Sequence, residues 1–337
     1  MDIRKVQLTG GSSYVVTLPK EWVTAHNIQK NDPLGLVIQP DGSLLVLQDI
    51  TEGQILRTKE FDIGTITDST YLFRLLIGAY INGYNIIRIT SKQRMPPFVA
   101  TIVRDFTQMT IGQQVVEETE NLIVLKDLLS PSEMPFENTL KRMYVIVKTM
   151  HQDAMEAIRN RNCDLARDVM SRDNDVDRLN WLISRQVNML MRNTNLSRKM
   201  GIQQHVAMNF LVISRIIERI ADHAVRIVSN TPHVVNKGVD EKILAKLESA
   251  SSLALSIFDR SIISLFNQDM KASHKNIESL AELERISGEI EELVLPLETP
   301  LAISIGYIAE SIRRTGEYAV DISETVINHL VEDEKAE

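Results

Sequence analysis

The fold is indicated most clearly by one stretch of the chain, FLVISRIIERIADHAVRI at residues 210–227. Apolar side chains recur in it with spacings that alternate between three and four residues, at Phe210, Ile213, Ile217, Ile220, Ala224 and Ile227. This spacing places them on one face of a helix and is typical of the seam of a left-handed helical bundle. The stretch therefore predicts a long amphipathic helix inside a bundle.

The same pattern returns close to the end of the chain. Residues 218–227 align with residues 313–322 at an offset of 95, and Arg, an acid, an aromatic ring, Ala-Val and Ile recur in register. An internal repeat of this kind indicates one structural unit used twice. Breaks rich in Asn and Pro delimit six expected helices, at 133–159, 164–193, 202–230, 239–267, 271–293 and 298–331. We expect an all-α domain over 133–337, built from three-helix repeats at 133–231 and 238–331.

The first 132 residues have a different composition. They contain 9 of the 14 glycines and 6 of the 10 prolines, which indicates short elements joined by many turns. The change falls at residues 129–133, where Ser and Pro supply a linker and a helix start signal. The sequence therefore predicts a multidomain protein.

Residues 1–50 predict an all-β domain. A β-branched and aromatic strand is expected over Ser13–Leu18, and strands at Leu34–Ile38 and Leu44–Leu47 form an expected hairpin around Asp41-Gly42. Fifty residues of hairpins bury too little apolar surface to be stable alone. We therefore expect this domain to form an obligate homodimer.

Residues 51–132 predict a small α/β domain. Helices are expected at 67–82 and 96–109, and strands at 84–90, 114–118 and 122–126. No motif in this domain identifies a ligand or a reaction, so the sequence leaves its role open.

Composition and motif searches exclude several classes of protein. Asp and Glu number 45 against 37 for Lys and Arg, a net charge of −8, so contact with nucleic acid requires a local basic patch. The sequence shows no signal peptide, no membrane-spanning apolar run and a single cysteine, Cys163, so we expect a soluble cytoplasmic protein. P-loop, nucleophile-elbow, His-Glu-x-x-His and Cys-x-x-Cys motifs are absent, so we expect no enzymatic activity.

Two pairs of acids stand on neighbouring expected helices. Asp173 and Asp177 are four residues apart, as are Glu218 and Asp222, so each pair shares one helix face. Four carboxylates aimed at one point repel one another unless cations lie between them, which is why such bundles bind metals. The spacing alone favours a solvated acidic face over a metal site, and oxygen ligands leave Fe, Mn, Zn, Mg and Ca open. His223 is expected to be a core or surface residue rather than a ligand.

The N-terminal domain resembles a known family. The segments RKV (4–6), GGSS (10–13), VVTLPKEW (15–22), NI (27–28) and ND (31–32) resemble the AbrB/SpoVT/MazE swapped-hairpin domain. In that family two chains interlace their hairpins into one DNA-binding unit. The resemblance implies that Arg4, Lys5 and Lys20 contact DNA, and that Ser12 and Ser13 contact phosphates.

The helical domain resembles PhoU, whose fold is two three-helix repeats. The matching segments are ERIADHAV at residues 218–225 and RDNDVDRL at residues 172–179. In PhoU-like proteins these acids hold multinuclear iron or zinc clusters, which implies a metal site at Asp173, Asp177, Glu218 and Asp222. In the second repeat Arg313 and Leu280 replace two of the acids, so only Glu284 and Glu317 remain as weaker candidates.

A swapped-hairpin domain ahead of PhoU repeats resembles archaeal PhoU-like regulators. The resemblance implies a non-enzymatic regulator of phosphate uptake and homeostasis, in which the first domain binds promoter DNA and the helical domain is a metal-binding sensor. The alternative is a protein–protein regulator that contacts the phosphate transporter ATPase or a signalling partner. In that case the N-terminal domain serves only for dimerisation.

Overall fold

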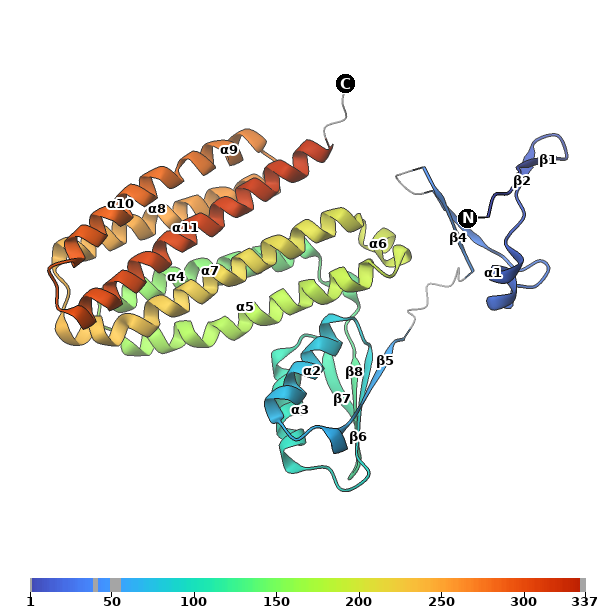
Figure 1. The fold of residues 1–337 in the computed structure, drawn as a ribbon, viewed down its shortest axis with the longest axis horizontal. Helices are drawn as coiled ribbons and strands as arrows, with labels where there is room; N and C mark the ends of the chain where they lie inside the picture. The colour runs from blue at the N-terminus through green and yellow to red at the C-terminus, as the bar shows by residue number, and fades with distance from the viewer. Residues whose placement is uncertain (1, 39–41, 49–55, 334–337) are drawn as a thin grey trace. The chain divides into compact units, whose positions relative to one another are not determined.

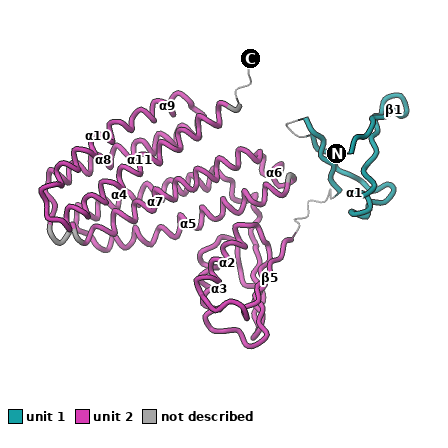
Figure 2. Tube along the Cα trace, viewed as in Figure 1, with its two compact units in different colours: residues 1–55 teal, residues 56–337 magenta. Residues whose placement is uncertain are grey.

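In the computed structural model, residues 2–38, 42–48 and 56–333 are described (Figure 1). The chain divides into two compact units, residues 1–55 and residues 56–337 (Figure 2). Among the described residues, no helix is both long enough and apolar enough to cross a membrane.

The first unit consists of two antiparallel hairpins and a short helix. The expected hairpin forms, with Leu36 opposite Val46, while its turn at residues 39–41 lies outside the described residues. The strand expected over Ser13–Leu18 is shorter and ends at Val15. The elements are β1 (Gln7–Thr9), β2 (Ser13–Val15), α1 (Lys20–Ala25), β3 (Gly35–Ile38) and β4 (Leu44–Leu47).

No described residue of the first unit is buried. Ile3, Tyr14 and Ile38 expose 84%, 79% and 81% of their surface, although such residues normally form a core. The strands therefore form without an interior of their own.

The second unit begins with a four-stranded sheet whose order is β5-β6-β8-β7. β5 runs parallel to β6, the other neighbours are antiparallel, and α2 and α3 pack on the sheet (Figure 1). Leu72, Leu76 and Tyr80 of α2 are fully buried against Ile87 and Ile89 of β6. The elements are β5 (Thr58–Asp62), a 3-10 turn (Ile63–Thr65), α2 (Ser69–Ile81), β6 (Ile86–Thr90), α3 (Pro97–Met109), β7 (Gln113–Glu118) and β8 (Leu122–Asp127). The sequence did not predict β5 or the 3-10 turn that follows it.

Two three-helix repeats follow, and their last helices, α7 and α11, pack along each other (Figure 1). The apolar face of residues 210–227 lies in the common core, with five of its six positions buried and Phe210 half-buried. The first repeat holds α4 (Phe136–Arg159), α5 (Cys163–Leu190), a short α6 (Thr194–Met200) and α7 (Gln204–Lys237). The second holds α8 (Glu241–Asn267), α9 (Met270–Glu278), α10 (Leu280–Val294) and α11 (Thr299–Asp333). The all-α, two-repeat fold class is confirmed.

The helices differ from the expected ones in three places. A short helix, α6, forms at Thr194–Met200, where the sequence predicted a break between helices. α7 continues through Pro232 to Lys237, whereas the sequence predicted an end at residue 230. Proline removes one backbone donor and usually ends a helix, but Val234 in the next turn is only 2% exposed, so burial favours continuation. The helix expected over 271–293 is two helices, α9 and α10, which meet at Ser279.

A buried ion pair fastens the α/β layer to the first repeat. Arg185 of α5 is 2% exposed and donates from Nε and Nη2 to Asp127 Oδ2 over 3.0 and 2.5 Å. Its Nη1 donates to the carbonyl of Tyr80 over 2.5 Å, and its guanidinium lies 4.9 Å from the centre of that ring. The α/β layer therefore contacts the helix that carries Asp173 and Asp177.

Candidate functional site

Four acids meet between α5 and α7 of the first repeat. Asp173 and Asp177 belong to α5, Glu218 and Asp222 to α7, and these helices pack against each other. Asp173, Asp177 and Glu218 are half-buried and Asp222 is exposed. The acids lie beside buried residues such as Val176, because the i and i+4 positions of each helix flank its apolar face.

Burial raises the pKa values of all four acids, and the neighbouring carboxylates add to this for three of them. Partial burial, followed by the charges of Asp222, Asp177 and Asp173, raises the pKa of Glu218 to about 7. Burial and the charges of Asp173 and Asp222 raise the pKa of Asp177 to about 6. Burial also raises the pKa values of Asp173 and Asp222, and for Asp222 the nearby Arg226 and Arg219 work in the opposite direction. The four carboxylates therefore lie within electrostatic reach of one another.

In the described part of the chain, no residue donates a hydrogen bond to any of these four carboxylates or forms an ion pair with one. Carboxylates that are partly buried and form no ion pair are suitable oxygen ligands for a hard or borderline metal cation. However, no three His, Cys, Asp or Glu side chains of the described ranges are close enough together to hold a metal ion. The structure thus gathers the donor set without forming a coordination shell.

His223 lies on the other side of α7, toward the second repeat. It is 7% exposed, and its ring centre is 5.6 Å from that of Tyr318 on α11. Burial, together with Arg226, lowers its pKa to about 4, so the ring is neutral at physiological pH. His223 is an interface residue between the repeats.

The second repeat replaces free acids with ion pairs. Glu317 pairs with Arg313 and, over 2.9 Å, with Arg314. Glu310 accepts from the same two arginines over 2.6 and 2.9 Å. Glu284 is exposed on α10. The two acids of the second repeat that the sequence named as weaker metal candidates therefore differ: Glu317 is neutralised by arginine and Glu284 faces solvent.

The residues that the sequence assigned to DNA contact all lie in the first unit. All five are exposed: Arg4, Lys5, Ser12, Ser13 and Lys20. Ser12 lies in the turn between β1 and β2, and Ser13 begins β2. The guanidinium of Arg4 pairs with Asp2 over 2.9 Å, which cancels part of the positive charge that the sequence predicted here.

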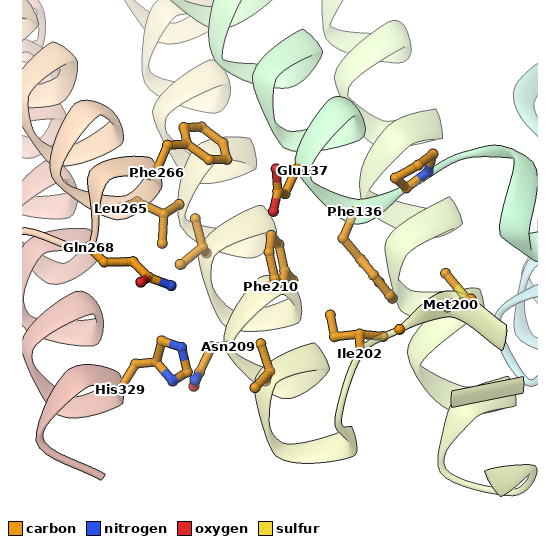
Figure 3. Close-up of a pocket in the computed structure, with 14 residues that line it drawn as sticks. Phe136, Glu137, Met200, Ile202, Asn209, Phe210, Leu265, Phe266, Gln268 and His329 are labelled. Carbon is orange, nitrogen blue, oxygen red and sulfur yellow. The ribbon is translucent and has the colours of Figure 1, made fainter. Parts of the chain in front are cut away.

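A cavity of about 300 Å³ lies at the ends of five helices, α4, α6, α7, α8 and α11 (Figure 3). Phe136 of α4 and Phe210 of α7 stack with their ring centres 5.4 Å apart, while Leu265 and Phe266 of α8 line the opposite side. The cavity shares no residue with the acid cluster. Sequence reasoning missed it because its residues come from helix ends that are distant in the chain.

The fold and the acid cluster together define the class of protein. It is a two-repeat helical bundle with free carboxylates on one repeat, and an α/β layer and a β unit without a core precede the bundle in the sequence. Residues 140–231 match the family model of the PhoU domain. Residues 7–54 match that of the antidote-toxin recognition protein MazE, a bacterial antitoxin. The chain is a PhoU-like protein with an N-terminal domain of the MazE/AbrB swapped-hairpin type.

Solved structures share the helical fold. PhoU from Pseudomonas aeruginosa is 16% identical, with a TM-score of 0.53 over 59% of this chain and 96% of its own. The phosphate transport system regulatory protein PhoU from Streptococcus pneumoniae is 14% identical, with a TM-score of 0.51 over 60% of this chain and 96% of its own. At this identity the likeness concerns the fold alone. Among curated proteins, none matches the chain.

Proposed function

We propose that this protein is a non-enzymatic regulator of phosphate uptake and phosphate homeostasis. The observation that carries the proposal is a set of four acids without ion pairs among the described residues, three of them half-buried, on two helices of the PhoU-type repeat. A group of anions that neighbouring cations do not neutralise responds strongly to a bound ion, which is what a sensor requires.

The acids Asp173, Asp177, Glu218 and Asp222 would hold the metal, with iron or zinc as the first candidates and other divalent ions open. The bound metal would supply positive charge that removes the mutual repulsion of the carboxylates. The i and i+4 placement on facing helices lets modest side-chain rotations bring the four together. The second repeat would take up little metal because Glu317 is already paired with arginines.

The first unit would form a homodimer that binds promoter DNA. Its exposed apolar residues need a partner surface, and a second copy of the same hairpins supplies one of matching shape. Dimerisation would double the exposed Lys5 and Lys20, which gives phosphates a basic patch on an otherwise acidic chain.

The second candidate function is regulation by contact with a protein, such as the phosphate transporter ATPase or a signalling partner. Two observations favour it. The matched MazE model describes antidote-toxin recognition, which is protein binding, and the Arg4–Asp2 ion pair thins the basic patch.

The deciding experiment measures DNA binding and metal content on one preparation of the full chain. Retention of DNA upstream of phosphate-transport genes supports the DNA-binding regulator. Co-purification of the transporter ATPase without DNA retention supports the protein–protein regulator. If the helical domain is a metal sensor, iron or zinc should bind the wild type. The double variant Glu218→Ala, Asp222→Ala should bind the metal at least about tenfold more weakly. The control variant Glu317→Ala should bind it as the wild type does. Absence of metal from the wild type after incubation with both ions contradicts the sensor proposal.

A further inference from the structure

Two arginines meet at the C-terminal end of α2, in the α/β layer whose role the sequence left open. Arg57 directly precedes β5, and Arg192 follows α5 of the first repeat. The Nη1 atoms of Arg57 and Arg192 both donate to the carbonyl oxygen of Asn82, over 2.5 and 2.9 Å. Arg192 Nη2 also donates to Asn82 Oδ1 over 3.3 Å. Two guanidinium groups therefore lie side by side.

These two positive charges are not balanced by carboxylates. In the described ranges neither arginine forms an ion pair, whereas nearby Arg185 is neutralised by Asp127. The negative end of a helix dipole is equivalent to about half an elementary charge. One arginine would satisfy this helix end, so a second one leaves a surplus of positive charge.

The arginines are held in place and remain accessible. The guanidinium of Arg57 stacks 4.3 Å from the centre of the Tyr84 ring, and Arg57 is only half-buried. Arg192 is exposed. Gly83, the residue after Asn82, adopts φ +78°. A Cβ added at this glycine would lie 2.7 Å from Met189 Cγ on α5, so the turn packs closely on that helix. The donors are thus pre-organised on a rigid base, with further N–H groups free to bind a ligand.

We propose that Arg57 and Arg192 form a binding site for a phosphate group. Guanidinium forks match the geometry of phosphate oxygens and bind them through paired charge-assisted hydrogen bonds. A dianion balances both arginines, whereas a carboxylate would balance only one. Arg57 belongs to the α/β layer and Arg192 to the first repeat, so the bound group bridges the two. The site is separate from the acids of the proposed metal sensor.

The test is calorimetric titration of the full chain with inorganic phosphate, in mildly alkaline buffer with a chelator so that no metal carries the anion. Chloride at matched ionic strength is the control ligand. Loss of one charge-assisted pair should weaken binding in Arg192→Ala by about tenfold to a hundredfold. Arg142→Ala, which removes an exposed arginine of α4 that forms no ion pair among the described residues, should bind as the wild type does.

A second arm uses vesicles that contain phosphatidic acid, to separate a lipid headgroup from free phosphate as the source. Binding to either probe that is lost in Arg192→Ala, and kept in Arg142→Ala, supports the site. Equal affinities in wild type and Arg192→Ala, or binding of neither probe, overturn it. The metal content of Arg192→Ala should equal that of the wild type, so failure here leaves the proposed sensor function separately testable.

Discussion

The charge state of Glu218 offers the sharpest test of the acid cluster. We expect Glu218→Gln to stabilise the metal-free protein at alkaline pH and to leave its stability unchanged at acid pH. The glutamine has nearly the same shape but carries no charge. Any gain therefore reports the repulsion and desolvation that the carboxylate suffers beside Asp177 and Asp222.

The sign and size follow from the raised pKa. Glu218 has a pKa of about 7 in the folded chain against 4.5 as its ordinary value. Below the unfolded pKa both states bind the proton and the carboxyl costs nothing. As pH rises from the unfolded to the folded pKa, only the unfolded state ionises, so stability is lost. The full shift corresponds to about 3 kcal/mol, and the partial exposure of the group reduces this to about 1–2 kcal/mol.

The assay is urea unfolding followed by helical circular dichroism, at acid and at alkaline pH, with chelator present. The difference between wild type and Glu218→Gln should grow by about 1–2 kcal/mol across this range. Glu284→Gln, at an exposed position of the second repeat, is the matched control and should show no such growth. Parallel pH profiles for wild type and Glu218→Gln would refute the reasoning, because the carboxylate would then be fully solvated in the folded state.

Three further outcomes are expected. Asp127→Ala leaves the buried charge of Arg185 without a partner and should cost about 3–5 kcal/mol in urea unfolding. Asp175→Ala, which breaks a partly exposed ion pair with Arg178, should cost under about 1 kcal/mol. If the first unit dimerises as proposed, Ile38→Asp, which places a charge on its exposed apolar surface, should give the mass of one chain in light scattering. A wild type that is itself monomeric contradicts the proposed dimer. If the first unit binds DNA through Lys5 and Lys20 of two chains, it makes about four phosphate contacts. DNA affinity should then fall about a hundredfold between about 50 and 200 mM salt. The double variant Lys5→Ala, Lys20→Ala should show a flatter salt dependence.

The long helices and the α/β class were predictable because their signals are local. A stripe such as Ile213, Ile217 and Ile220 reports burial within two helical turns, and these residues are buried in the structure. β5 was missed because Thr58–Asp62 is short and polar on its exposed face. It pairs only with β6, from which α2 separates it in the sequence. The extension of α7 past Pro232 was missed because tertiary burial of Val234 overrides the local signal.

The acid cluster and the Arg57–Arg192 pair also differ in how far the sequence predicts them. The acid cluster could be anticipated, since i and i+4 spacing on two adjacent helices places the carboxylates on facing surfaces. The Arg57–Arg192 pair carries no spacing signal, because its members come from distant segments that meet only when α5 packs on the α/β layer. The Arg4–Asp2 pair is the reverse case, since a contact between near neighbours in the sequence offsets the charge of a residue that the resemblance assigned to DNA contact.

The asymmetry of the two repeats follows from a few sign changes along one helix face. At the offset of 95, Glu218 becomes Arg313 and Arg226 becomes Asp321, so the second repeat holds a cation where the first has a free acid, and an acid where the first has a cation. Glu310 and Glu317 of the second repeat are paired with arginines, whereas the acids of the first repeat repel one another. The buried pair of Arg185 and Asp127 attaches the α/β layer to α5, which belongs to the repeat with the unbalanced charge. A change of charge at Asp173 and Asp177 therefore acts on a helix that the α/β layer contacts, whereas Glu218 and Asp222 belong to α7, which packs against α11 of the second repeat.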